Sequence, residues 1–359
     1  MVLSDLHLGA HSRSDVLRDA APRARLTAAL SGYDRLVLLG DVLELRHGPL
    51  REALAAAREP LGEIGAALGH GAEVVVLTGN HDHHLVEPWM ARRAAAGPPP
   101  RLGTETAVDW RDGEPLAALA QMLAPARVRA AYPGLWLRDD VYATHGHYLD
   151  LHLTVPTLER LGAGVMRRVV ALNAAGPASA DDYETVLMPL YAWVHAIAQL
   201  ADADRSRVLH GGSVRGWQAL AGPRRARGIR RTALAGAFPL LVAGVNRAGL
   251  GPLRAEISGP ELRRSGLRAL EEVVSRLGVG ARHVIFGHTH RAGPLPANDP
   301  AEWTTAAGAQ LLNTGSWVRE PAFLGPDPDQ SPYRPGFGVV VEDEGPPRLV
   351  NLLDPPDRA

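Results

Sequence analysis

The stretch VVVLTGNHD, residues 74–82, decides the fold prediction for this chain. Its first residues form a β-branched and leucine-rich run, which is typical of a strand buried on both faces. The run ends abruptly in a polar cluster. Two similar runs come earlier, Val2–Ser4 before Asp5 and Arg35–Leu39 before Gly40. We therefore expect three buried strands, each followed directly by polar residues.

The segments between these runs have the spacing of helices. Val16–Leu30 and Leu50–Leu68 are rich in Ala, Leu, Arg and Glu, with apolar residues at helical intervals. The first part of the chain is thus predicted to alternate strand and helix, which indicates an α/β fold. Further strands are predicted at Leu135–Thr144, His283–Phe286, Gln310–Leu312, Gly338–Val341 and Leu349–Leu353. For the later of these strands, both parallel and antiparallel pairing are open.

The strand pattern is interrupted in the middle of the chain. The 359 residues exceed the usual length of one domain, so a large domain with an insertion and a domain with a cap are both reasonable. Residues 151–278 are mostly helical in character and are predicted to be an insertion or lid. Residues 1–150 and 279–359 are then expected to form the N-terminal and C-terminal halves of one α/β domain.

Composition narrows the classes of function. Hydrophobic residues make up 46%, charged residues 21%, and the net charge is −1, so nothing attracts the whole chain to nucleic acid or acidic membranes. Cysteine is absent, which excludes disulfides, thiolate metal sites and cysteine nucleophiles. No apolar run approaches the roughly eighteen residues of a membrane-spanning helix, and no signal peptide is evident. We interpret the chain as cytoplasmic.

Five polar clusters follow predicted strands, and their convergence carries the functional prediction. In an open α/β sheet, ligands gather beyond the carboxyl ends of the strands, so these clusters are expected to meet in one crevice. Alternation in Asp5-x-His7 and His288-x-His290 would point both members of a pair the same way if the chain is extended there. Glycines at positions 40, 79, 146 and 287 would allow tight turns or close approach. The clusters are Asp5-Leu6-His7, Gly40-Asp41, Gly79-Asn80-His81-Asp82, His145-Gly146-His147 and Gly287-His288-Thr289-His290.

The residue types in these clusters favour a transition metal. Imidazole, carboxylate and one amide oxygen suit manganese, iron or zinc better than calcium. Two ions about 4 Å apart would share a bridging hydroxide and bind the oxygens of a phosphate. Asp41, alone after its glycine, is the natural bridging carboxylate. A single histidine cluster would more often be structural, but five in this order favour a dinuclear site.

The order D-x-H, GD, GNHD, H-G-H and GHTH resembles the calcineurin-like metallophosphoesterases and spans Asp5 to His290. The resemblance implies a four-layer α/β/β/α sandwich and leaves the helical middle of the chain unexplained. It implies a first metal site of Asp5, His7, Asp41 and His290, and a second of Asp41, Asn80, His145 and His288. It also implies that His81 hydrogen-bonds the phosphate and protonates the leaving group, with Asp82 orienting it.

Two departures from the family pattern concern single motifs. Only Met1 to Ser4 precede Asp5, where the family usually has a longer first strand, so a truncated start is one interpretation. His147 stands where some relatives carry Asp in H-G-D, and either a supporting role or a substrate contact is open for it. The chain is distantly similar to the bacterial UDP-2,3-diacylglucosamine pyrophosphohydrolases, but those enzymes usually read GNRD and H-G-D, so that reaction is not assigned.

Residues near the motifs carry weaker predictions. His83 and His84 extend GNHD, and a solvated loop is favoured over extra ligands. Arg46 and His47 are candidate phosphate contacts, with plain surface exposure as the alternative. Tyr191 and Trp193 lie in a helical stretch, where aromatic residues are usually core.

Two further segments are predicted to lie away from the catalytic motifs. Asn313–Trp317 is expected to be structural and to close the floor of the site. Arg224–Val245, basic and then apolar, is either a cap helix or a contact to a membrane surface or lipid.

The sequence therefore predicts a dinuclear phosphoesterase that hydrolyses a phosphodiester, phosphomonoester or pyrophosphate, lipid- or nucleotide-linked, through a metal-bridging hydroxide. One alternative is a DNA nuclease or repair phosphodiesterase, against which the near-neutral charge and the scarcity of aromatic residues count. Another is a catalytically silent interaction scaffold. That alternative predicts missing metal ligands, and no ligand position lacks its residue.

Overall fold

The computed structural model describes residues 1–155, 158–169, 176–200, 242–247, 253 and 259–354. The strands are β1 (Val2–Leu3), β2 (Arg35–Leu39), β3 (Glu73–Leu77), β4 (Glu105–Val108), β5 (Arg127–Arg138), β6 (Val141–Thr144), β7 (His283–Phe286), β8 (Gln310–Asn313), β9 (Phe337–Val340) and β10 (Arg348–Asn351). The helices are α1 (Ala20–Leu30), α2 (Leu50–Leu68), α3 (Glu87–Ala95), α4 (Pro115–Met122), α5 (Leu158–Val169), α6 (Ala180–Leu200), α9 (Gly259–Arg276) and α10 (Pro321–Leu324).

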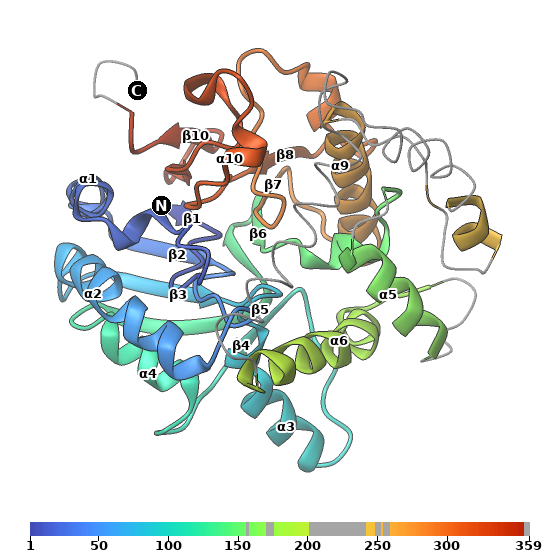
Figure 1. Ribbon diagram of the computed structural model, residues 1–359, viewed down its shortest axis with the longest axis horizontal. Coiled ribbons are helices and arrows are strands. Elements are labelled where there is room, and N and C mark those ends of the chain that lie inside the picture. Colours follow the sequence, from blue (N-terminus) through green and yellow to red (C-terminus); the bar gives the residue numbers. More distant parts are fainter. Residues whose placement is uncertain (156–157, 170–175, 201–241, 248–252, 254–258, 355–359) are drawn as a thin grey trace, which may run out of the picture. The chain divides into compact units, whose positions relative to one another are not determined.

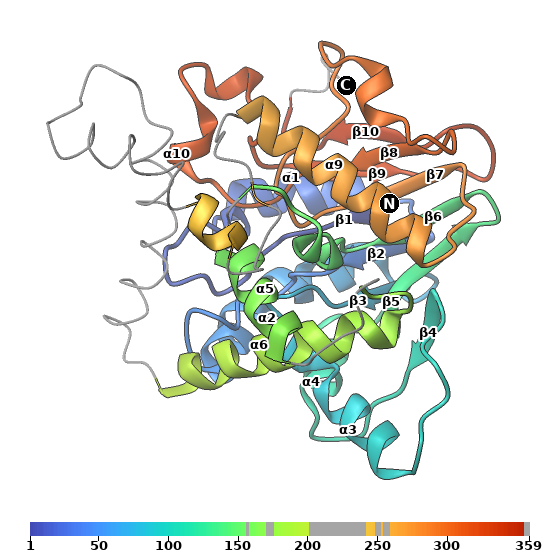
Figure 2. The same cartoon turned by 90° about the vertical axis from the view of Figure 1, so that its right-hand side faces the viewer.

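A mixed sheet in the order β10-β9-β1-β2-β3-β5-β6-β7-β8 forms the centre of the fold, with β4 paired to β5. β1, β2 and β3 lie side by side and are parallel, in the register Val37↔Val75 between β2 and β3 (Figure 1, Figure 2). β6, β7 and β8 are also parallel to one another. β9 and β10 are antiparallel to their neighbours.

The long strand β5 belongs to both halves of the sheet. Its first residues pair with β3 and its last residues pair with β6. Inward-facing apolar side chains from both halves form one buried cluster: Val2, Val37, Leu39, Val75, Leu77, Ala131, Leu135, Val141, Ala143, Ile285, Leu312 and Val339. The two halves therefore pack face to face, and burial of this cluster is the main stabilising contribution.

Helices cover the outer face of the first half-sheet. Leu36 and Leu38 of β2, which alternate with the inward-facing residues, are also fully buried. Figure 1 shows α1, α2 and α4 along this side of β1 to β3. α2 buries Ala53, Ala57 and Leu61 at intervals of four residues, as expected for one face of a helix. The strands are thus buried on both faces, which explains their continuous apolar sequence.

The described residues divide into two compact units. One lies within Met1–His147, Tyr191–Ala203 and Val279–Ala359, and the other within Tyr148–Leu190 and Asp204–Gly278. In the second unit the rings of Tyr148 and Tyr183 are stacked at 4.5 Å, and Thr154 N–H donates to Ser265 Oγ at 2.8 Å. The predicted insertion over residues 151–278 stays a prediction.

The α/β fold predicted from the sequence is confirmed, with corrections to single elements. Leu135–Thr144 is not one strand, because the chain turns at Asp139 and Asp140 between β5 and β6. The helix predicted from Val16 starts only at Ala20, since Asp19 is extended (φ −92°, ψ 137°). Within the described residues, no helix is both long and apolar enough to cross a membrane.

Candidate metal centre

The polar clusters lie beyond the ends of five strands. Asp5 follows β1, Asp41 follows β2, Asn80 follows β3, His145 follows β6 and His288 follows β7. The first three strands are parallel neighbours, as are the last two, so each half-sheet presents its clusters at one edge. Since the two halves pack face to face, these edges bring the five clusters together.

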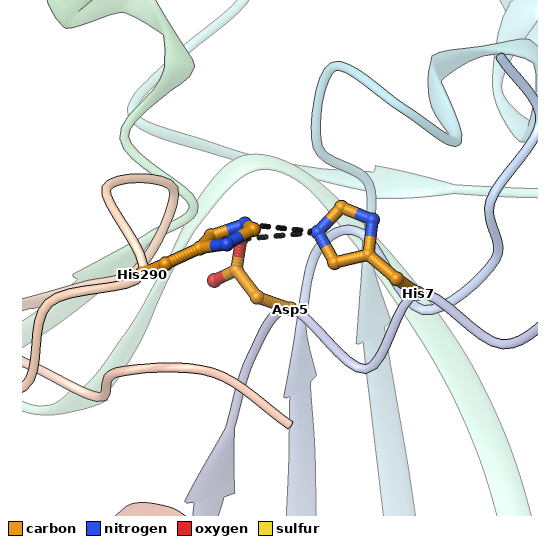
Figure 3. Close-up of side chains that lie close together, drawn as sticks. All are labelled: Asp5, His7 and His290. Atoms are coloured by element: carbon orange, nitrogen blue, oxygen red, sulfur yellow. Dashed lines mark hydrogen bonds and ion pairs between the residues drawn. The ribbon is translucent and has the colours of Figure 1, made fainter. Parts of the chain in front are cut away.

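One group of side chains combines Asp5 and His7 of the first polar cluster with His290 of the last. Asp5, His7 and His290 point toward one another (Figure 3). His7 Nε2 lies 3.0 Å from His290 Nε2 and 3.7 Å from Asp5 Oδ1. His290 Nε2 lies 3.2 Å from the same carboxylate oxygen. Three potential ligand atoms thus surround one point.

A second group contains Asp41, Asn80, His145 and His288. His145 Nε2 is 3.3 Å from Asp41 Oδ2 and 3.2 Å from Asn80 Oδ1. His288 Nδ1 is 3.1 Å from the same amide oxygen. The side chain of Asp41 also faces the first group, because its Oδ2 lies 3.7 Å from His7 Nε2. One carboxylate oxygen is therefore within reach of both groups.

Five of the predicted ligands have an unusual backbone. Their positive φ angles are 56° at Asp5, 47° at His7, 50° at Asp41, 65° at His288 and 57° at His290. Outside glycine, this conformation costs roughly 1–3 kcal/mol and persists where surrounding contacts impose it. The extended backbone predicted for the two alternating pairs is thus wrong. His288 and His290 point into different groups, so they would not bind the same ion.

The tight approach of the clusters depends on glycine, as Gly79 and Gly287 show. A Cβ atom at Gly79 would lie 2.2 Å from Asp41 Oδ1 and 2.5 Å from His145 Nε2. A Cβ atom at Gly287 would lie 2.4 Å from Asp5 Oδ2. All three distances are far below van der Waals contact. These glycines are therefore required for the approach of the ligand side chains, as the sequence predicted.

The two groups of side chains are suited to divalent metal ions, because several of their potential ligand atoms are directed at one another. Asp5 Oδ1 is buried, and no hydrogen bond reaches it within the described residues. His145 Nδ1 donates to Leu39 O at 2.9 Å, so Nε2 is the ring nitrogen directed at Asn80 Oδ1 and Asp41 Oδ2. Against the effect of burial, the neighbouring carboxylates raise the pKa of His145 to about 9, so in the absence of metal a proton on Nε2 supplies the positive charge between these groups. A divalent cation would take the place of that proton.

The orientation of the Asn80 amide distinguishes metal binding from hydrogen bonding. With the amide turned over, its nitrogen would donate to Asp41, His145 and His288 at 3.1–3.2 Å, and its oxygen would accept from Arg46 Nη2 at 2.9 Å. The metal-binding arrangement needs the oxygen on the side of the histidines. The two arrangements therefore differ by one rotation of the side-chain amide.

Both aspartates of the centre are held ionised. Burial alone would raise the pKa of Asp5, but His145, His290 and His7 outweigh it and hold the pKa below its usual range. Burial likewise opposes ionisation of Asp41, and His145 and His81 hold the pKa of that carboxyl well below normal. Ionised carboxylates are the form that binds a metal ion.

A buried glutamate that the sequence interpretation missed supports the centre. Glu44 Oε2 lies 3.0 Å from His7 Nδ1 and 2.9 Å from His81 Nδ1, and the side chain is 2% exposed. Although burial opposes ionisation, His47, His81 and His7 hold the pKa of Glu44 well below normal. The carboxylate fixes the proton of His7 on Nδ1 and so presents Nε2 to the first group. His7, Glu44 and His81 also form a third cluster of metal-binding residue types, but the direct hydrogen-bond distances favour a supporting role.

His81 lies beside the centre with Glu44 on one side and Arg46 on the other. Arg46 Nη1 is 3.4 Å from His81 Nε2, and Arg46 Nε donates to Asn80 O at 3.2 Å. Burial lowers the pKa of His81 to about 3, opposed by Glu44 and assisted by Arg46. The imidazole is therefore neutral at neutral pH when no ligand is bound.

The carboxylate of Asp82 does not have the predicted position. It accepts hydrogen bonds from backbone N–H groups, at 2.7 Å from both Val42 and Gly79 and at 3.2 Å from Asp41. No hydrogen bond joins it to His81 among the described residues, and the carboxylate that faces His81 is Glu44. Asp82 therefore fixes the loop after β2 against the loop after β3.

Two other histidines also differ from expectation. His47 and His83 are buried, so surface exposure is wrong for the first and a solvated loop is wrong for the second. His84 is partly exposed. His147 is buried, with Nε2 3.2 Å from Tyr132 Oη and its ring 5.6 Å from that of His145. This position favours a supporting role over a substrate contact.

The predicted floor of the site is buried and bonded to the ligand loops. Asn313 Nδ2 donates to Gly287 O at 3.0 Å, and Trp317 N–H donates to Asp5 O at 2.9 Å. Trp193 is 63% exposed, so the prediction that it is core is wrong, whereas Tyr191 is buried. Residues 224–241 of the predicted lipid-contact segment lie outside the described residues.

Comparison with known protein families gives a match over more than half of the chain. A family model described as calcineurin-like phosphoesterase matches residues 1–227. The match contains Asp5, His7, Asp41, Asn80 and His145 and ends before His288 and His290, which lie beside these residues in the structure. No curated protein matches the chain, so the distant similarity to the UDP-2,3-diacylglucosamine pyrophosphohydrolases stays a prediction.

Proposed function

Because the chain belongs to the calcineurin-like phosphoesterases, which are metal-dependent phosphoester hydrolases, we propose that its reaction takes place at a dinuclear centre. Asp5, His7 and His290 would hold one ion, Asn80, His145 and His288 the other, and Asp41 would contact both. When bound, the ions supply a water of lowered pKa and a charged clamp for the phosphate. The ligand set favours manganese, with iron or zinc as alternatives.

The single observation that carries this proposal is the position of Asp41. Its Oδ2 lies 3.3 Å from His145 Nε2 and 3.7 Å from His7 Nε2, so one oxygen links two groups of acceptor atoms. The buried oxygen of Asp5 and the contact among Asp41, His145 and Asn80 support it. A silent scaffold would have no reason to retain strained backbone at five ligand positions.

Arg46 and His81 are the groups that would contact the phosphate. Their Nη1 and Nε2 atoms lie 3.4 Å apart at the edge of the centre. Arg46 contributes positive charge for the phosphate oxygens. His81 is neutral without ligand, so it can protonate the leaving group only if the bound phosphate, together with Glu44, raises its pKa. Glu44, rather than Asp82, would orient it.

His47 and His147 are assigned no contact with the substrate. His47 Nδ1 lies 3.7 Å from Glu44 Oε2, and its burial favours support of that carboxylate over phosphate binding. His147 would support His145. A phosphodiester, a phosphomonoester and a pyrophosphate all fit the chemistry of the centre.

The proposal is tested with purified protein that has been stripped of metal and reloaded with manganese. Hydrolysis of bis-p-nitrophenyl phosphate and p-nitrophenyl phosphate is measured beside metal content by elemental analysis. We expect about two ions per chain and activity that returns with the metal. A chain that binds no metal, or binds it without cleaving any phosphate ester in a broad substrate panel, contradicts the proposal and supports the scaffold alternative.

A further inference from the structure

We propose that Tyr191 of α6 is a positioning residue for Arg46, so that a residue from the helical middle of the chain sets the geometry of phosphate binding. This inference rests on the proposed function, because it assumes that Arg46 contacts the phosphate. It goes beyond the motif residues, since none of the five polar clusters contains Tyr191.

Arg46 is held from three directions. Its Nε donates to Asn80 O at 3.2 Å, and its backbone N–H donates to Glu44 Oε1 at 2.9 Å. Its guanidinium carbon lies 5.5 Å from the centroid of the Tyr191 ring. The first two contacts fix the base of the side chain and one edge of the guanidinium group. The tyrosine ring covers a face of that group, which leaves Nη1 directed at His81.

Tyr191 itself has a fixed position. It is 3% exposed, and its ring lies 5.3 Å from that of His83 and 5.8 Å from that of His147. His83 follows the GNHD motif, and His147 is the last residue of the H-G-H motif. The ring is therefore packed against the loop after β3 and the loop after β6 while it covers Arg46.

Three further contacts attach the end of α6 to the loop after β3 and to the segment between β2 and α2. The ring of His195 stacks on that of His84 at 3.9 Å. Gln199 Oε1 accepts from Leu50 N–H at 3.1 Å, and its Nε2 donates to Gly48 O at 3.4 Å. Tyr191, His195 and Gln199 are four residues apart, so they lie on one face of the helix. This face fixes α6 on the segment that begins with Arg46.

The physical effect is preorganisation of a flexible cation. An arginine side chain loses considerable rotamer freedom when it binds a ligand, and a guanidinium group already fixed against an aromatic face loses less. A cation over a partly desolvated ring gains about 1–2 kcal/mol of attraction, which corresponds to roughly five- to thirtyfold in an equilibrium constant. Removal of the ring should thus weaken phosphate binding without emptying the metal sites.

The test uses the full chain loaded with manganese and inorganic phosphate as the probe. The Kd of phosphate is measured by calorimetry for wild type, Tyr191→Phe, Tyr191→Leu, Arg46→Ala and the Tyr191→Leu/Arg46→Ala double variant. Trp193→Leu is the matched control, because it removes an aromatic ring from the exposed face of the same helix. Metal content and the denaturant midpoint are measured for each variant, and KM and kcat are measured separately.

We expect Arg46→Ala to weaken phosphate binding roughly ten- to hundredfold and Tyr191→Leu roughly five- to tenfold. Tyr191→Phe and Trp193→Leu should remain within about twofold of wild type. In the Arg46→Ala background, Tyr191→Leu should have no further effect, because the interaction is already absent. The loss should appear chiefly in KM, with the metal content unchanged.

Other results overturn the inference. An equal effect of Tyr191→Leu with and without Arg46, or a loss as large in Tyr191→Phe, would show that the ring does not act through the guanidinium group. Loss of metal in Tyr191→Leu, with phosphate binding normal in Tyr191→Phe, would indicate a packing role only. Wild-type protein without two metals contradicts the proposed function itself, whereas an active wild type whose phosphate affinity is insensitive to Tyr191→Leu contradicts only this inference.

Discussion

Replacement of Glu44 by glutamine should impair the first metal site although Glu44 is not one of its ligands. One carboxylate oxygen accepts from His7 at 3.0 Å and from His81 at 2.9 Å. The other accepts from Arg46 N–H at 2.9 Å. A glutamine of the same shape must place its NH₂ group against a donor in either orientation. The contact between two donors is removed if the proton of His7 moves from Nδ1 to Nε2, because Nδ1 then accepts from the glutamine NH₂ group.

That tautomer removes the lone pair that the metal requires. His7 Nε2 faces Asp5 and His290, so protonation at this atom competes directly with a cation bound there. Changes in groups that hydrogen-bond metal ligands typically reduce metal affinity or activity about 10- to 100-fold. We therefore expect the Kd of manganese at the first site to rise by that factor, which corresponds to about 1.4–2.8 kcal/mol.

The assay is calorimetric titration of metal-free protein with manganese, followed by measurement of kcat at saturating metal. Glu52→Gln is the matched control, because Glu52 also accepts from a histidine, His11, at 3.1 Å but is half exposed and belongs to none of the three groups of metal-binding residue types. We expect the control to bind manganese like wild type. Equal affinity and equal kcat in Glu44→Gln and Glu52→Gln would refute the tautomer argument.

Four further substitutions separate the roles of the GNHD loop. Asn80→Ala should empty one of the two metal sites, as elemental analysis would show, and two retained ions would remove it from the ligand set. His81→Ala should keep both metals and lower kcat on a poor leaving group about 10²- to 10⁴-fold; unchanged turnover would end its assignment as acid. Asp82→Asn should lower the free energy of unfolding by roughly 2–4 kcal/mol in denaturant titration, because the carboxylate accepts several backbone N–H groups. Gly79→Ala should abolish metal binding in a folded chain, since the new Cβ would lie 2.2 Å from Asp41 Oδ1, and normal metal content would contradict the close approach.

The framework was predictable because strand ends carry strong local signals. Apolar runs such as Arg35–Leu39 end at a single glycine, and the polar residue beyond each run needs only a parallel neighbour to reach a common edge. The turn at Asp139 and Asp140 was not predicted, although Arg138, Asp139 and Asp140 form a run of three charged residues between apolar ones. The local sequence therefore predicted the strands and the polar residues at their ends. The order of strands in the sheet, which brings the residues after β6 and β7 close to those after β1, depends on contacts far apart in the sequence.

The supporting contacts were harder to predict, since they depend on packing. Asp82 is adjacent to His81 in sequence, yet its carboxylate bonds the backbone of two loops, and Glu44 takes the position beside His81. A signal for Glu44 existed: it is a lone charge in the apolar stretch Val42–Leu45, and a buried carboxylate requires partners. Tyr191 offered no such signal, because a buried tyrosine in a helix is ordinary core.

The central claim is that two ions share Asp41, and anomalous diffraction from crystals of the manganese-loaded protein tests it most directly. We expect two manganese peaks, one among Asp5, His7, His290 and Asp41 and the other among Asp41, Asn80, His145 and His288. A single peak, or a peak coordinated by Glu44 and His81 in place of either group, would contradict the account.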